Sequence, residues 1–85
     1  MFTTYILRNK ITGRYYIGST NDLNRRLSER NGGQTKSTNQ KGSWLVVYTE
    51  EFSTAIEAKR RERKIKSYKS GNAFKKLLRA AMVQW

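Results

Sequence analysis

Three segments of the chain have the hydrophobic pattern of β-strands. Residues 2–8 and 14–19 are rich in β-branched and aromatic side chains, and residues 9–13 between them suit a turn. The sequence therefore predicts a hairpin. Residues 44–49 form the most strongly strand-like segment of the chain, and we expect this strand at the centre of the sheet.

The faces of the hairpin depend on its turn, because successive side chains of a strand point to opposite sides. A turn with an even number of residues places Tyr5 and Leu7 on the same face as Tyr16 and Gly18. A turn with an odd number separates the two tyrosines, and the sequence leaves both registers open. A glycine within a strand, such as Gly18, is typical of a bulge or of a point where a ligand's backbone approaches closely.

A first helix is expected directly after the hairpin. A residue within 19–21 caps this helix, and Asp22 in its first turn suits the helix dipole. Leu23 and Leu27 lie one turn apart and predict the buried stripe. The helix is expected to end at residues 31–33, which tolerate the left-handed conformation.

Two arginines of this helix differ in their expected direction. On a helical wheel Arg26 lies about 60° from Leu23, whereas Arg25 lies about 160° away. Arg26 therefore borders the inward side and Arg25 points to solvent. If one of the pair serves a site, we expect it to be Arg26.

A second helix is predicted from Thr54, which forms a capping box with Glu57. Its inward face combines residues at helical spacing: Ala55, Ala58, Glu62 and Ile65. An ionised carboxylate at the core is unfavourable unless it is paired or binds a metal ion. Glu62 is therefore interpreted either as a metal ligand or as the partner of Arg26 or a neighbouring lysine.

The remaining segments are a polar loop and a third helix. Residues 34–43 lack apolar periodicity; their lysines, Lys36 and Lys41, suit phosphate contacts, although a solvated loop explains them as well. The third helix has an apolar stripe that closes the core: Phe74, Leu77, Leu78, Ala81, Met82 and Trp85. Trp85 is either a frayed end or a contact with a partner.

Composition narrows the class of protein. A chain of 85 residues is expected to form one domain, residues 1–85. Cysteine and histidine are absent, which excludes disulfides, zinc–thiolate sites and a histidine base. The net charge of +12 favours a nucleic-acid partner over a membrane surface. With no apolar run of membrane-spanning length, we expect a soluble, cytoplasmic and nucleoid-associated protein that does not bind membranes.

These residue types are compatible with phosphodiester hydrolysis. One Mg²⁺ held by Glu62, waters and substrate phosphate needs no further carboxylate. Arg26 could bind the phosphate, and Tyr5 or Tyr16 could position or deprotonate the water. A tyrosine base requires a pKa well below about 10, and we expect nearby cations to lower it. Two tyrosines in a hairpin are, however, more often packing residues than catalysts.

The ordered motifs of the chain resemble the GIY-YIG nuclease superfamily. Tyr5-Ile6-Leu7 is followed by Tyr16-Ile17-Gly18 and by residues 19–27, and the similarity continues through 31–33, 44–48, 51–52, Ala58, 61–62 and 65–66. It covers about residues 4–68 and is closest to the small stand-alone UvrC-type (YhbQ-like) branch. The resemblance implies an α+β fold, in which a three-stranded antiparallel β-sheet is flanked by three helices in the order strand, strand, helix, strand, helix, helix.

The resemblance also implies metal-dependent endonuclease chemistry. Tyr5, Tyr16 and Arg26 match the catalytic residues of the family, and Glu62 matches its metal-binding glutamate. One Mg²⁺ or Mn²⁺ ion is implied. We expect the DNA to be contacted by residues around these positions: Gly18, Ser19, Arg25, Arg30, Lys36 and Lys41. We further expect Glu62 to face Tyr5, Tyr16 and Arg26 across one open cleft.

Some positions depart from the family pattern. Thr3-Thr4 replaces the glycine before the first tyrosine, Arg30 stands where many relatives have a histidine, and Ser19 stands where the repair enzymes have a lysine. Asn72 is a weak counterpart of an asparagine used by some members. The leading hypothesis is a DNA endonuclease of repair or recombination that acts on branched, flapped or nicked DNA. The alternatives are an inactive DNA- or RNA-binding module of the same fold and a ribosomal-type RNA-binding protein; a protein partner or a homodimer is left open.

Overall fold

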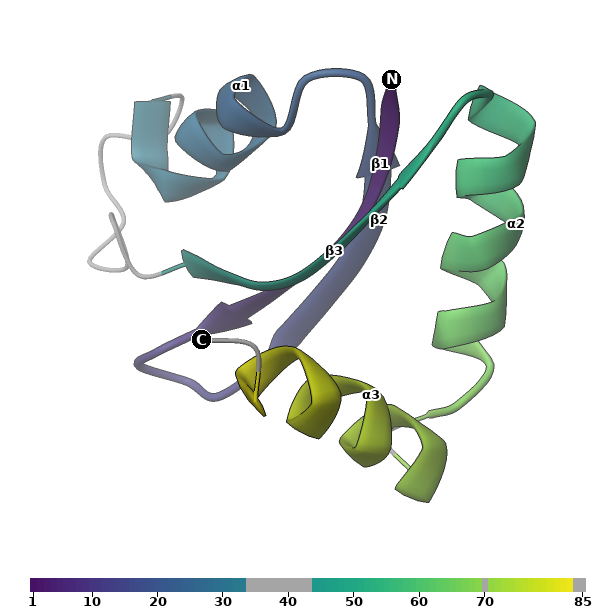
Figure 1. Cartoon of the computed structure of the whole chain (residues 1–85). Helices are drawn as coiled ribbons and strands as arrows, with labels where there is room; N and C mark the ends of the chain where they lie inside the picture. The colour runs from purple at the N-terminus through teal and green to yellow at the C-terminus, as the bar shows by residue number, and fades with distance from the viewer. Residues whose placement is uncertain (34–43, 70, 84–85) are drawn as a thin grey trace.

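The computed structural model describes residues 1–33, 44–69 and 71–83, and within them it shows a three-stranded antiparallel sheet and three α-helices (Figure 1). The strands are β1 (Phe2–Asn9), β2 (Tyr15–Thr20) and β3 (Trp44–Phe52). The helices are α1 (Leu23–Ser28), α2 (Ala55–Lys66) and α3 (Asn72–Val83), and a π-helical turn, η1 (Glu29–Gly33), continues α1. The predicted α+β class and order of elements are confirmed.

The strand order is β2-β1-β3, so that β1 is central. Our expectation that the third strand is central was therefore wrong. Four consecutive residues of β1, from Thr4 to Leu7, are buried, whereas Leu45 in β3 is 48% exposed. β1 tolerates its central place despite its threonines because the Thr4 hydroxyl donates a 2.7 Å hydrogen bond to the Ala58 carbonyl of α2.

The hairpin register settles which side chains share a face. Tyr5 pairs with Gly18 and Leu7 with Tyr16, which is the register of an even-length turn. The Asn9 side chain stabilises this turn because its Oδ1 accepts hydrogen bonds from the backbone N–H groups of Ile11 (2.9 Å) and Thr12 (3.0 Å). The two tyrosines therefore lie on one face of the sheet, and their neighbours Ile17 and Ser19 lie on the other.

Helices cover both faces of the sheet. Figure 1 shows α1 on one side and α2 and α3 on the other. The core on the second side contains Ile6 of β1, Ile65 of α2 and Phe74 of α3, all buried. The Tyr15 and Phe74 rings meet in a T-shaped arrangement, with centroids 5.1 Å apart, and this contact joins α3 to the hairpin.

The predicted cap of α2 is confirmed, whereas the predicted cap of α1 was wrong. Thr54 caps α2 by accepting a hydrogen bond from the Glu57 N–H (3.2 Å), as predicted. The cap of α1 is Asp22, whose carboxylate accepts from the Arg25 N–H (3.1 Å), rather than a residue within 19–21. In α3, Phe74 is buried and Leu77 and Leu78 are half-buried as expected, whereas the later positions of the predicted stripe lie outside the described side chains.

A polar network fixes α2 against β3. The Arg61 guanidinium donates a 3.1 Å hydrogen bond to the Glu50 carboxylate, which also accepts one from the Tyr48 hydroxyl. These groups are half-buried, so the pair is shielded from solvent better than an exposed ion pair. This anchoring sets the position of Glu62, the residue that follows Arg61. No helix within the described segments is long and apolar enough to cross a membrane.

Two isoleucines of α2 test the assignment of its inward face. Ile65 is fully buried and Ile56 is 70% exposed. We predict that Ile65→Ala lowers the free energy of unfolding by about 2–5 kcal/mol, because it removes buried methyl groups and leaves a cavity. The matched Ile56→Ala change should stay within about 0.5 kcal/mol of the wild type. Urea denaturation followed by circular dichroism measures both, and equal effects would contradict the assignment.

Candidate active site

Tyr5 and Tyr16 lie together on the α1 side of the sheet. Their ring centroids are 6.2 Å apart and their planes are tilted by 32°. The Tyr5 ring crosses over Gly18, so that a Cβ atom at Gly18 would lie 2.6 Å from the Tyr5 hydroxyl and 2.8 Å from its Cζ. Gly18 is buried, and the space left by its missing side chain is filled by the Tyr5 phenol rather than being open to a ligand. The glycine thus serves the packing of Tyr5, and a direct DNA contact of Gly18 does not fit this geometry.

Arg30 lies over the second tyrosine. Its guanidinium carbon is 3.8 Å from the centroid of the Tyr16 ring and 5.0 Å from that of the Trp44 ring. The cation–π contact attracts the guanidinium to both aromatic faces. The neighbouring Asn31 holds Trp44 in place, since its amide donates to the Trp44 carbonyl (3.2 Å) and its carbonyl accepts from the Trp44 N–H (2.9 Å). Trp44 was not among the predicted site residues, because a strand pattern alone does not distinguish it from its neighbours.

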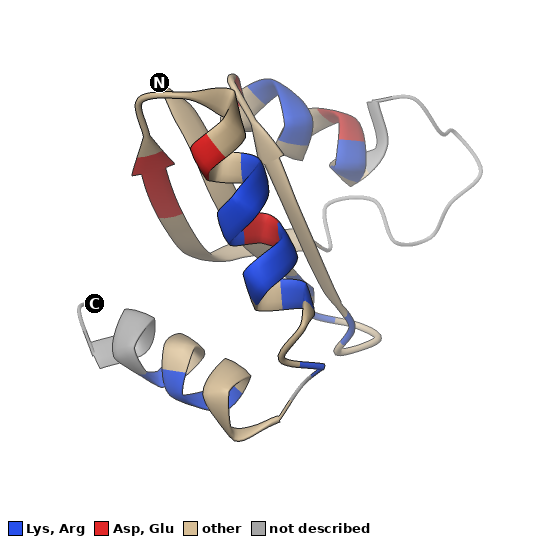
Figure 2. Ribbon diagram, turned by 90° about the vertical axis from the view of Figure 1, so that its right-hand side faces the viewer, with Lys and Arg blue, Asp and Glu red and all other residues tan. Residues whose placement is uncertain are grey.

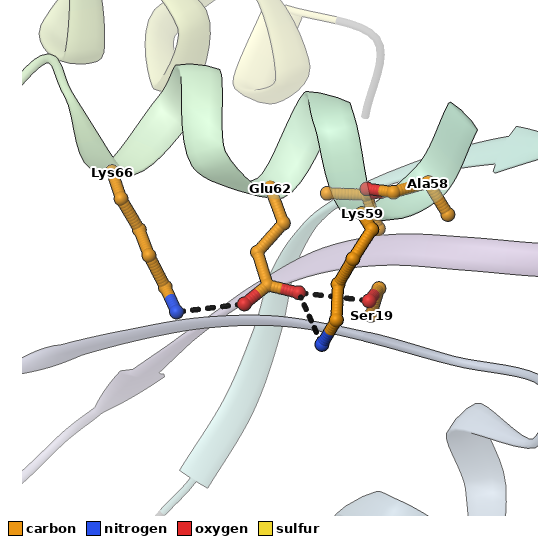
Figure 3. Close-up of polar contacts among 6 residues, drawn as sticks. Ser19, Ala58, Lys59, Glu62 and Lys66 are labelled. Carbon is orange, nitrogen blue, oxygen red and sulfur yellow. Dashed lines mark hydrogen bonds and ion pairs between the residues drawn. The ribbon is translucent and has the colours of Figure 1, made fainter. Parts of the chain in front are cut away.

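Glu62 approaches the sheet from the opposite side. It is 7% exposed and its carboxylate points to β2, where the Ser19 hydroxyl donates a 2.8 Å hydrogen bond to Oε1 (Figure 3). Lys66 donates a 2.7 Å hydrogen bond to Oε2, and the Lys59 ammonium lies 3.5 Å from Oε1. Of the partners proposed for Glu62, the neighbouring lysines are those that the structure shows. Arg26 instead lies 4.0 Å from Glu29.

The lysines decide the ionisation of Glu62. Burial on its own would raise the pKa of the Glu62 carboxyl, but the hydrogen bonds from Lys66 and Ser19 and the charges of both lysines outweigh it. The pKa is therefore lowered below its usual value, and the group is a carboxylate at neutral pH. Helical spacing could have found both partners, since Lys59 precedes Glu62 by three residues and Lys66 follows it by four.

The tyrosines, on one face of the sheet, and Glu62, on the other, both lie next to β2, which is an edge strand. A surface hollow of about 270 Å³ at the end of this strand is lined by Ser19, by Arg26 from α1 and by Lys59 from α2, among others. Glu62 was expected to face Tyr5, Tyr16 and Arg26 across one open cleft. That expectation was wrong, because Glu62 and the tyrosine rings lie on opposite faces of β2, and this hollow is lined by Arg26 but not by Glu62 or the tyrosines. The sheet separates Glu62 from the tyrosine rings, because residues 18 and 19 point to opposite faces.

The ionisation of Tyr5 also differs from the expectation. Burial raises the pKa of the Tyr5 phenol above its usual 10, and the Tyr16 and Glu62 groups raise it further. The charges of Arg26 and Arg30 lower it without cancelling the effect of burial. Tyr5 is consequently a neutral phenol at physiological pH and does not act as a base of lowered pKa.

The other predicted contact residues are less connected to this site. Arg25 is exposed on α1, and Asn72 is exposed at the start of α3. Lys36 and Lys41 lie outside the described residues. The described lysine and arginine residues are concentrated along α2, as Figure 2 shows. Those of α2 are Lys59, Arg60, Arg61, Arg63, Lys64 and Lys66.

The donor groups fit a single hard cation that keeps most of its waters. Glu62 supplies an ionised carboxylate and Ser19 an adjacent hydroxyl, and Mg²⁺ is commonly held by one or two carboxylates together with substrate phosphate. The described residues contain no group of three or more acidic, histidine or cysteine side chains that could enclose a metal ion. The arrangement thus fits a cation that is shared with a substrate and does not form an all-protein cage.

Acid should weaken the contribution of Glu62 to stability. Because its folded pKa lies below the unfolded value of about 4.3, this contribution is complete above roughly pH 5 and is lost as the pH falls through the lowered pKa. We predict that the difference in unfolding free energy between the wild type and Glu62→Gln shifts against the wild type between pH 6 and pH 3. Urea midpoints across this range measure it. A difference that does not change with pH would contradict the ion pairs.

The close packing of the Tyr5 ring against Gly18 leads to a second prediction. Gly18→Ala forces the buried Tyr5 ring to move and should destabilise the protein by about 1–3 kcal/mol. Tyr5→Phe removes the atom nearest to the new methyl group. The double variant should therefore lose less stability than the sum of the two single variants, as measured by urea denaturation. Strict additivity would show that the two residues do not touch.

The chain is similar to known proteins in both sequence and fold. Residues 1–76 match the GIY-YIG catalytic domain family. A UPF0213 protein of Halobacterium salinarum is 42% identical over 55 residues, which cover 64% of this chain and 71% of the relative. The solution NMR structure of a UPF0213 protein from Bacillus halodurans has a TM-score of 0.54 at 32% identity, over 94% of this chain and 84% of that one. The chain, with its paired tyrosines on a hairpin and its glutamate on α2, belongs to the GIY-YIG catalytic domain family.

Proposed function

We propose that the protein is a metal-dependent DNA endonuclease that hydrolyses phosphodiester bonds at the hollow beside β2. GIY-YIG domains are nuclease domains, which supports the reaction class. The observation that carries the assignment is that Arg26 and Lys59, on helices from opposite faces of the sheet, line the same hollow next to Ser19 and Glu62. Two cations around one small hollow suit a phosphate, and the net charge of +12 suits a polyanion.

Each side chain has a role that its surroundings allow. Arg26, half-exposed and bound only weakly to Glu29, binds the phosphate and offsets the charge that develops on its oxygens. Tyr5, a neutral phenol, acts as a hydrogen-bond donor, and its ring packs beside that of Tyr16. Tyr16 is 37% exposed and can meet the attacking water, which Tyr5, at 1% exposure, can do far less well.

Glu62 is the residue that would hold the Mg²⁺ or Mn²⁺ ion. When bound, such an ion acts as a Lewis acid on the phosphoryl oxygens and lowers the pKa of its water. The Ser19 hydrogen bond fixes the carboxylate toward the edge strand, on the side of the hollow. We place the substrate among branched, flapped or nicked DNAs of repair or recombination, because within the described residues no helix is dedicated to reading base edges.

Binding without cleavage is a second candidate function, and one observation favours it. Both carboxylate oxygens of Glu62 are engaged by lysine ammonium groups. In a chain that had lost turnover, such pairing would stabilise the fold without serving a metal ion. Cleavage assays separate the two candidates, whereas salt-dependent binding does not, because both contact phosphates.

The decisive experiment measures cleavage of labelled linear, nicked, flapped and branched DNA with Mg²⁺, Mn²⁺ or a chelator. We predict metal-dependent nicking or branch cleavage by the wild type. Arg26→Ala and Glu62→Ala should each reduce the rate by about 100-fold or more, because they remove electrostatic stabilisation of the transition state. DNA affinity in a gel-shift assay should be largely retained.

A matched control removes a positive charge elsewhere. Arg79 is exposed on α3, and Arg79→Ala should cleave DNA at close to the wild-type rate. If the wild type binds these DNAs but leaves all of them intact with either metal ion, the binding function is correct. If Glu62→Ala cleaves like the wild type, the catalytic centre lies elsewhere.

A further inference from the structure

The charges around Glu62 oppose a metal ion in the free protein. Its single carboxylate lies against two ammonium groups, with Lys59 beside Oε1 and Lys66 beside Oε2. The local charge of this trio is positive. A divalent cation that approaches the carboxylate therefore meets net repulsion and must also displace hydrogen-bond donors from both oxygens.

The two lysines are free to move away, unlike the carboxylate itself. Their side chains are 61% and 54% exposed, whereas that of Glu62 is 9% exposed. Each ammonium is carried by a flexible four-carbon stem, and ion pairs of such exposed lysines are weak. A stronger anion close by can thus take the lysines without any movement of α2.

The position of Lys59 identifies this anion. Lys59 and Arg26 line the same hollow, and Ser19 connects that hollow to Glu62. A phosphate bound in the hollow would be within the range of the Lys59 stem. Lys66 follows Lys59 by about two turns of the same helix, so a second phosphate of the same strand can engage it.

We propose that Lys59 and Lys66 form a lysine clamp that exchanges Glu62 for DNA phosphates. Without DNA the clamp neutralises the carboxylate and keeps its oxygens occupied. When DNA binds, both ammonium groups turn to the phosphates and leave the carboxylate to a divalent cation. The inference rests on the proposed function and deepens it, because it makes the site take up its metal ion only together with the substrate.

Thermodynamic linkage gives the clamp a measurable signature. If DNA raises the affinity for the metal ion, the metal ion raises the affinity for DNA by the same factor. Removing the clamp reduces this coupling, and only the part that comes from a phosphate ligand shared with the ion remains. In that case the free protein binds the metal ion more tightly than the wild type does, and DNA changes the affinity by a smaller factor.

The experiment measures Mn²⁺ binding by electron paramagnetic resonance, with and without a short DNA duplex. The same measurement with Glu62→Gln and DNA corrects for Mn²⁺ held by the duplex. The wild type should bind Mn²⁺ roughly tenfold or more tightly when DNA is present, the range typical of coupled sites. The Lys59→Gln/Lys66→Gln variant should bind Mn²⁺ more tightly than the wild type without DNA and should gain less affinity when DNA is added. Both lysines are exposed, so this variant is expected to fold, which circular dichroism checks.

A second double variant separates the clamp from overall charge. Arg60 and Lys64 are exposed on the same helix and are not among the partners recorded for Glu62 in the described residues. Arg60→Gln/Lys64→Gln removes the same amount of charge and should leave Mn²⁺ affinity and its coupling to DNA near wild type. Equal gains in Mn²⁺ affinity for both double variants would overturn the clamp in favour of a general charge effect.

Two further outcomes distinguish the clamp from the proposed function. Wild-type protein that binds Mn²⁺ equally well with and without DNA, yet cleaves DNA, would refute the clamp and leave the endonuclease standing. If adding Glu62→Gln to the Lys59→Gln/Lys66→Gln variant leaves its Mn²⁺ affinity in the absence of DNA unchanged, the metal ion is held elsewhere. That result would overturn both the clamp and the metal site assigned to Glu62.

Discussion

The pairing of Tyr5 with Gly18 determines what each face of the sheet can do. In this register the tyrosines point to α1, and the next residue of β2, Ser19, points to α2. A slip of one residue would turn β2 over. Ser19 would then lie on the face of Tyr5, out of reach of Glu62, and Tyr16 would leave Tyr5 for the opposite face. Two features stabilise this register. The Asn9 side chain holds the turn, and the missing side chain of Gly18 leaves the space that the Tyr5 ring fills. Position 18 therefore links the fold to the chemistry.

The site is divided by the sheet and rejoined at its edge. The aromatic half, with Tyr5, Tyr16 and Arg30, lies on the α1 side, and the charged half around Glu62 lies on the α2 side. Because β2 is an edge strand, a ligand can contact both halves without entering the core. A central strand in this place would have sealed the halves from each other. The strand order is thus a condition for the site as well as a feature of the fold.

The sequence could predict which residues share a face, but not which faces meet. Helical spacing correctly identified Ala58, Glu62 and Ile65 as inward residues of α2, whereas Ala55, predicted on the same face, is exposed. Alternation showed which residues within each strand of the hairpin share a face. The turn length that decided between the two registers could not be read from local pattern. The place of β3 at the edge was missed because an apolar strand segment reports local propensity, whereas strand order depends on packing across the whole sheet. The pKa of Tyr5 was misjudged for a related reason: charges are visible in a sequence, and the depth of burial that outweighs them is not.

The Asn31 side chain acts on Trp44 in the way that a neighbouring strand would, by satisfying both its N–H and its carbonyl. These two bonds join the end of η1 to the start of β3, although the positions are 13 residues apart in the chain. Asn31 and Trp44 are therefore held together by their own hydrogen bonds, whichever residues connect them in the chain. Insertions or exchanges in the intervening segment can alter which molecules the domain meets while Arg30, Tyr16 and Trp44 keep their arrangement. The asparagine gives the domain a place where specificity can evolve at little risk to its chemistry.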